Sequence, residues 1–161
     1  IAQVRGACYL IDVGTGTTDI SPISSDKAID LSKARTLQVG ISNCISMVNE
    51  AISREYQTEL PVDVIIDVMV GKDVVLPTAI IELIEDVISQ WCDMLLRTLH
   101  QNKIDYRLTQ TFFAGGGAML LSKYAKSIDP AKTCITYITD IKANAIGYEL
   151  LAAAQQKKQS N

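Results

Sequence analysis

The residues best suited to chemistry form a short run between positions 12 and 19, which reads Asp-Val-Gly-Thr-Gly-Thr-Thr-Asp. Glycines in a turn let backbone N–H groups approach an anion without a Cβ in the way, and threonine hydroxyls add donors to phosphate oxygens. A carboxylate at the mouth of such a turn, here Asp12, can hold a hydrated magnesium ion or orient an attacking water. The run therefore predicts a phosphate-binding hairpin. The alternative is an ordinary Gly-rich hairpin whose acids lie on the surface.

A second glycine cluster lies about a hundred residues later, where Gly115, Gly116 and Gly117 follow the apolar run 112–114. Three glycines between a strand and a helix let a flat ring or a ribose lie against bare backbone near the helix N-terminus. The alternative is a tight strand-to-helix turn in which the glycines only permit close packing.

The elements that must position these clusters follow from the hydrophobic pattern. Short apolar or alternating runs predict strands at 7–13, 19–24, 34–39, 109–114 and 134–137. Apolar spacings of three and four predict helices at 41–56, from Pro77 to about His100, at 118–127 and at 141–155. The segment 60–75 fits either a short helix or a strand with a turn. This order predicts one α/β domain over residues 1–161, with a five-stranded mixed sheet, helices on both faces and a small insert at about 59–76.

Composition narrows the classes of function. The 161 residues are 48% apolar, and the net charge of -3 has no basic cluster of the kind that nucleic-acid binding requires. Acidic residues interrupt every apolar run before it reaches membrane-spanning length. The cysteines are far apart among apolar neighbours, and only one histidine is present, so we expect four reduced, buried thiols in a cytoplasmic protein rather than a zinc site. They are Cys8, Cys44, Cys92 and Cys134.

Together, the order and spacing of the two glycine clusters resemble the second phosphate motif and the adenosine motif of the superfamily of actin, sugar kinases and heat-shock chaperones. The chain looks most like the C-terminal half, domain II, of ParM/StbA actin-like plasmid-partition ATPases, whose fold is ribonuclease H-like. The likeness includes Gly40-Ile41-Ser42 at the start of a helix, the segment 144–148 and the small middle insert.

The resemblance implies a role for each site residue. Asp12 would be the catalytic carboxylate that serves magnesium, through water, and the hydrolytic water. Gly40 would lie along the ribose side. Thr15 stands where many relatives have glycine, so its backbone must avoid positive φ. The β- and γ-phosphates would be held by Gly14, Thr15, Gly16, Thr17 and Thr18, and the nucleoside would lie on Gly115, Gly116 and Gly117.

The resemblance also implies cofactors and partners: ATP or GTP with Mg²⁺, self-association into filaments, and a DNA-binding adaptor protein, without direct contact to nucleic acid or membrane. The superfamily's first phosphate loop has no counterpart here, so we expect it in an N-terminal half that precedes Ile1, and we expect the chain alone to be inactive. Two alternatives remain: half of a small-molecule kinase of the same superfold, or a non-catalytic actin-like scaffold for pilus assembly or cell division.

Overall fold

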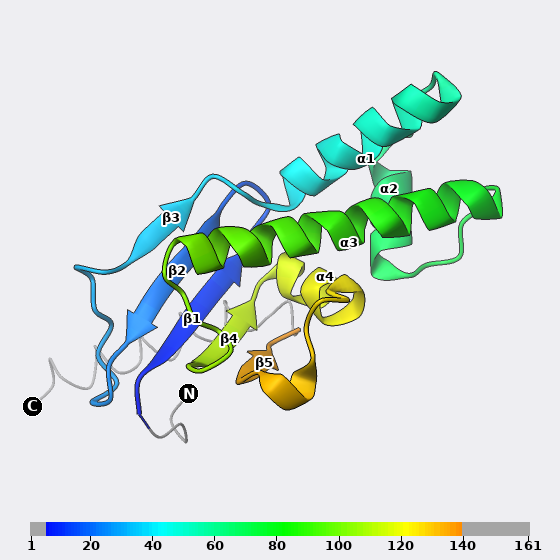
Figure 1. The fold of residues 1–161 in the computed structure, drawn as a ribbon. Coiled ribbons are helices and arrows are strands. Elements are labelled where there is room, and N and C mark those ends of the chain that lie inside the picture. The colour runs from blue at the N-terminus through cyan, green and yellow to red at the C-terminus, as the bar shows by residue number, and fades with distance from the viewer. Residues whose placement is uncertain (1–5, 140–161) are drawn as a thin grey trace, which may run out of the picture.

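A mixed five-stranded sheet lies at the centre of the computed structural model, which describes residues 6–139 (Figure 1). The strand order is β3-β2-β1-β4-β5. The first three strands along the chain pair antiparallel, whereas β1 with β4 and β4 with β5 pair parallel. The predicted five-stranded mixed sheet is therefore confirmed. The strands are β1 (Cys8–Val13), β2 (Thr18–Ile23), β3 (Arg35–Leu37), β4 (Gln110–Ala114) and β5 (Ile135–Tyr137).

Four α-helices and one short 3-10 helix accompany the sheet: α1 (Ile41–Tyr56), α2 (Val62–Val70), α3 (Thr78–Gln101), α4 (Gly116–Tyr124) and η1 (Pro130–Lys132). The ambiguous segment 60–75 contains a helix, α2, which ends at Gly71 with a φ of 79°. The helix α4 begins two residues before its predicted start, so the glycine cluster itself opens the helix. The helix predicted at 141–155 lies outside the described residues.

The alternation of side chains along β1 defines the two faces of the sheet. Ile11 and Val13 belong to the large core cluster that also contains buried residues of all four α-helices. Cys8 points to the other face, where it packs with Ile23 and Phe112. Figure 1 shows α3 crossing the sheet between α1 and α4. The described α-helices therefore cover one face of the sheet. The expectation of helices on both faces also depends on the helix predicted at 141–155, which lies outside the described residues.

Burial of the cysteines differs from the prediction at one position. Cys8, Cys44 and Cys92 are buried and free, but Cys134 is exposed. Cys134 directly precedes β5, which is the edge strand of the sheet, so its side chain leaves the core that the apolar neighbours suggested. Within residues 6–139, no helix is both long and apolar enough to cross a membrane.

Candidate functional site

The first predicted cluster forms the tip of the hairpin between β1 and β2. Strand register pairs Val13 with Thr18, and the amide of Gly14 donates a hydrogen bond of 2.9 Å to the carbonyl of Thr17, which closes the turn. Thr15 and Gly16 lie exposed at the tip. Thr15 does not have a positive φ, so its backbone can carry a Cβ at the position where many relatives have glycine. The loop thus presents backbone amides at an open edge of the sheet.

The start of α1 packs directly behind this hairpin. The amide of Ile41 donates to the carbonyl of Gly14 (3.1 Å), and the amide of Ser42 donates to the carbonyl of Thr15 (2.8 Å). A Cβ placed on Gly40 would lie 2.5 Å from the carbonyl oxygen of Thr15. The position therefore needs glycine because of its close approach to the hairpin backbone. Its conformation does not require glycine, since a φ of -150° is one that any residue adopts.

The second glycine cluster lies against the end of β1. Gly115 has a φ of 79°, and a Cβ on it would overlap the Oδ1 of Asp12 and lie 2.6 Å from the carbonyl oxygen of Val13. A Cβ on Gly117 would overlap the side chain of Val13. Gly116 is exposed, and its Cβ would meet only the Cδ1 of Ile41, at 2.9 Å. Two of the three glycines are thus required by packing, and the middle one faces open space apart from one methyl group.

Asp12 occupies the last-but-one position of β1, between the two clusters. It pairs with Asp19 on β2 and with Ala114 on β4, and it is half-buried. Because directly paired antiparallel residues project to the same face of a sheet, Asp12 and Asp19 lie side by side. Asp19 accepts hydrogen bonds from the hydroxyls of Thr17 (3.2 Å) and Thr36 (2.5 Å). Among the described residues, no group of three or more His, Cys, Asp or Glu side chains could hold a metal ion.

Thr18 differs from its neighbours in the hairpin. Its side chain is fully buried, and its hydroxyl donates a 2.7 Å hydrogen bond to the carbonyl of Val39, just before α1. A hydroxyl committed in this way is not offered to a phosphate. The Thr18 side chain therefore anchors the hairpin to the start of α1, whereas the hydroxyl of Thr17 bonds the exposed Asp19.

Three residues at the site were given no role from the sequence. Ile41 lies beside Gly116, Val13 lies against Gly117, and the side chain of Asn43 accepts a 2.8 Å hydrogen bond from the amide of Gly40. Glycine has no side chain that could complete a capping box, so the Gly-x-x-Asn pattern is not the usual sequence signature and Asn43 was not predicted from it. The contacts of Val13 and Ile41 join segments that are distant in the chain and carry no local signal.

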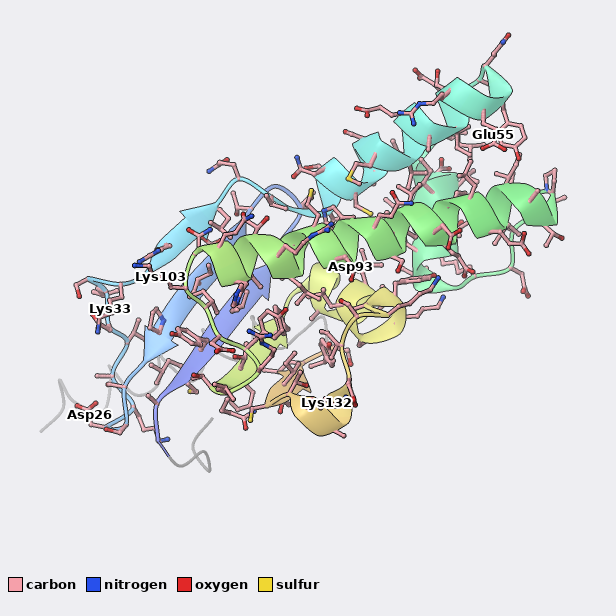
Figure 2. The ribbon with its side chains drawn as sticks, viewed as in Figure 1. Asp26, Lys33, Glu55, Asp93, Lys103 and Lys132 are labelled. Carbon is pink, nitrogen blue, oxygen red and sulfur yellow. The ribbon has the colours of Figure 1, made fainter. Side chains whose placement is uncertain are left out.

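A hollow between α3 and the segment 127–133 contains none of these residues. It has a volume of about 450 Å³, and Asp93 and Lys132 lie on its two sides (Figure 2). Asp93 accepts a hydrogen bond from Ser127, and Lys132 forms an ion pair of 3.1 Å with Asp129. Two polar pairs of this groove thus bond one another, whereas the hairpin tip and Gly116 lie together beyond the C-terminal ends of the parallel strands β1 and β4.

The mixed sheet, with a glycine hairpin after its first strand and a strand–Gly-Gly-Gly–helix junction beside it, matches the actin-like fold. Residues 10–126 match the family of archaeal actin homologues described as MreB-like, in its C-terminal domain, and the chain belongs to this family. No curated protein matches the chain.

Solved structures extend the match over nearly the whole chain. The native structure of an archaeal actin homologue, Ta0583, is 25% identical with a TM-score of 0.71, and covers 94% of this chain and 50% of its own. A ParM filament from Clostridium botulinum is 21% identical with a TM-score of 0.66, covering 89% of this chain and 44% of its own. MreB5 of Spiroplasma citri bound to AMPPNP is 17% identical with a TM-score of 0.67, covering 98% and 56%. The chain therefore spans about half the length of these relatives.

Proposed function

We propose that this chain is the nucleotide-binding half of a filament-forming, actin-like ATPase. The observation that carries the proposal is the convergence of three segments at one edge of the sheet: the hairpin tip with Thr15 and Gly16, the carboxylate of Asp12, and the bare backbone of Gly116. Ta0583 has been solved in complex with ADP and MreB5 with AMPPNP, which supports a nucleotide as the ligand.

Each segment suits a different part of ATP. The exposed amides of Thr15 and Gly16, with the hydroxyl of Thr17, would hold the β- and γ-phosphates. Gly116 leaves the space that a nucleoside would occupy at the start of α4, with Gly115 and Gly117 fixing the position of that helix. A nucleotide bound in this way would place its phosphates beside the carboxylate of Asp12.

Hydrolysis would depend mainly on positioning and on charge. Asp12 would orient the attacking water, and through water it would hold Mg²⁺, which would neutralise charge on the phosphate oxygens. A single half-buried carboxylate at the mouth of the loop suits a hydrated ion, because Mg²⁺ usually keeps several waters. Either GTP or ATP fits these contacts, since none of them reads the base.

The hairpin would provide donors on one side of the phosphates only. Relatives are about twice as long as this chain, so we propose that a facing half supplies the remaining contacts. The 161-residue chain by itself should then hydrolyse ATP no faster than background, whereas the complete gene product should hydrolyse ATP measurably. A rate of about 0.1 per second or more from this chain alone, within the range of kinases and GTPases, would contradict the half-site proposal.

Within the filament-forming class, we propose a role in DNA segregation of the ParM type, through a DNA-binding adaptor protein. The insert between α1 and α3 holds a single helix of nine residues, α2, which suits the small insert on which the ParM resemblance rests. Light scattering and electron microscopy of the complete gene product should show filaments with ATP. Phosphorylation of a sugar or other small molecule instead would favour the kinase alternative, and filaments that form only on pili or at the division site would favour the scaffold.

A further inference from the structure

We propose that the N-terminus of α1 is the positioning element of the phosphate loop, with Gly40 and Asn43 as its positioning residues. It holds two peptide groups of the hairpin so that the amides of Thr15 and Gly16 point toward the ligand. This inference rests on the proposed function, because it assigns α1 a part in phosphate binding.

The directions of the two amides follow from the hydrogen bonds that their peptide groups make. The carbonyl of Gly14 accepts from the amide of Ile41, and the carbonyl of Thr15 accepts from the amide of Ser42. Both peptide groups are trans, and in a trans peptide the C=O and the N–H point in opposite directions. The N–H in the same group as the Gly14 carbonyl belongs to Thr15, and the one in the same group as the Thr15 carbonyl belongs to Gly16. Because α1 holds both carbonyls, both N–H groups point away from α1.

The two amides are available where they point. Thr15 and Gly16 are exposed, and neither amide donates a backbone hydrogen bond to another residue between 6 and 139. Two successive N–H groups on one side of a turn form a concavity that binds anions. A hydrogen bond to the carbonyl of a peptide group polarises that group, and the N-terminus of α1 adds its partial positive charge behind the loop. The arrangement therefore strengthens the donors as well as aiming them.

Gly40 makes this arrangement possible through its size. A Cβ on Gly40 would lie 2.5 Å from the carbonyl oxygen of Thr15 and 2.6 Å from the carbonyl carbon of Gly16, both backbone atoms that cannot move aside without moving the loop. The side chain of Asn43 accepts from the amide of Gly40 and fixes the first turn of α1 in register. In this proposal Gly40 acts on the phosphates through the loop, whereas the resemblance implied a place along the ribose.

The test compares ligands with and without phosphate, measured by calorimetry on the complete gene product. In Gly40→Ala, the affinities for ATP and ADP should fall about tenfold or more, roughly 1.4 kcal/mol, while the affinity for adenosine stays within about twofold. Gly71→Ala is the matched control, because Gly71 has a φ of 79° at the end of α2 and its substitution strains the backbone away from the loop. That control should lower the melting temperature and leave the ratio of ATP to adenosine affinity unchanged.

Two further measurements keep the test decisive. Asn43→Ala removes the cap without adding bulk, and it should lower ATP affinity in the same direction even if Gly40→Ala does not fold. Amide hydrogen exchange without nucleotide should show protection of Ile41 and Ser42 that is lost in Gly40→Ala. Equal losses of ATP and adenosine affinity, unchanged ATP affinity in both variants, or unprotected amides in the wild type would overturn the inference and leave the proposed function standing. A wild-type protein that binds neither ATP nor ADP, with both amides protected, would instead overturn the proposed function.

Discussion

The carboxylate of Asp12 lies against the α-carbon of Gly115, so closely that a Cβ on Gly115 would overlap the Oδ1 of Asp12. Gly115 adopts a φ of 79° at the junction of β4 and α4, and Asp12 pairs with Ala114 across the sheet. The candidate catalytic carboxylate and the start of the nucleoside-side helix therefore form one unit. A change that moves either of them should move the other. A substitution that enlarges a side chain at this junction should therefore disturb both.

Asp12→Asn should cut ATP hydrolysis about a hundredfold or more in the complete gene product, because an amide cannot orient the attacking water or hold the hydrated ion as a carboxylate does. The shape of the side chain is kept, so the contact with Gly115 survives and nucleotide affinity should change by less than about threefold. Filaments of this variant should form with ATP and persist. Steady-state phosphate release and calorimetry measure the two effects.

Asp19→Asn is the control for this carboxylate. Asp19 lies beside Asp12 on the same face of the sheet, but it is exposed and accepts hydrogen bonds from Thr17 and Thr36, which an amide oxygen can also accept. Hydrolysis by this variant should remain within about tenfold of the wild type. Near-normal hydrolysis by Asp12→Asn would remove Asp12 from its proposed role.

Gly116→Val should weaken ATP binding about tenfold or more, roughly 1.4 kcal/mol, without unfolding the domain. Gly116 is the first residue of α4, and its Cβ would meet only the flexible end of Ile41, so the nucleotide-free melting temperature should change little. The branched side chain would fill the space proposed for the nucleoside. Of the three glycines, only Gly115 has a positive φ, so valine at Gly116 meets no left-handed backbone.

Gly117→Ala separates packing from binding. Its Cβ would overlap the side chain of Val13 in the core, and overpacking of this kind costs about 1–3 kcal/mol of folding free energy. Its melting temperature should therefore fall well below that of Gly116→Val. A loss of cooperative melting in Gly116→Val, with normal ATP binding by the folded remainder, would show that the middle glycine is structural and that the nucleoside lies elsewhere.

Much of this fold could be predicted from the sequence because its signals are local. The period of three to four residues gave α1 its bounds, and the apolar runs predicted every strand to within a few residues. The two glycine clusters were predicted separately from their residues, and only the resemblance to the actin superfamily implied that they serve one nucleotide. What could not be predicted depends on contacts between distant segments. The hydroxyl of Thr18 bonds the carbonyl of Val39, and Gly40 lies against Thr15, neither of which a linear pattern reveals.

Thiol labelling should distinguish Cys134 from the other cysteines. Cys134 is exposed, whereas burial raises the pKa of the Cys44 thiol to about 12 and also raises the pKa of Cys92. The thiolate is the reactive form, so the buried groups should not react at pH 8. Titration with an aromatic disulfide should label one fast thiol in the native chain and four after denaturation, and Cys134→Ser should abolish the fast reaction. Rapid labelling of Cys44 in the native chain would contradict its burial.

Folding stability should decrease at alkaline pH. Burial raises the pKa of Tyr137 from its usual 10.0 to about 12, and that of Cys44 from 9.0 to about 12. Because the folded values are raised, the neutral forms contribute stability below the unfolded pKa values, and this contribution is lost as pH rises from about 9 to 12. Urea midpoints across this range measure the loss. Tyr137→Phe keeps the ring that stacks on Phe113 at 5.9 Å and should show a smaller alkaline decrease, whereas an equal decrease would exclude Tyr137 as a source.

Thr18→Val and Thr17→Val should affect different properties, folding stability and phosphate binding respectively, although the two residues are adjacent in the hairpin. Valine has nearly the shape of threonine but cannot donate a hydrogen bond. In Thr18→Val the carbonyl of the half-buried Val39 loses its 2.7 Å donor, so the free energy of unfolding should fall by about 0.5–1.5 kcal/mol. Phosphate contacts do not involve this hydroxyl, so the affinity for ATP, measured well below the melting temperature, should stay within about twofold.

In Thr17→Val the lost hydroxyl bonds an exposed Asp19, so stability should change by less than about 0.5 kcal/mol. The ratio of ATP to adenosine affinity should fall there instead, because Thr17 is proposed to donate to phosphate. A fall in that ratio in Thr18→Val, with unchanged stability, would return Thr18 to the phosphate-binding set and would place the anchor between the hairpin and α1 elsewhere.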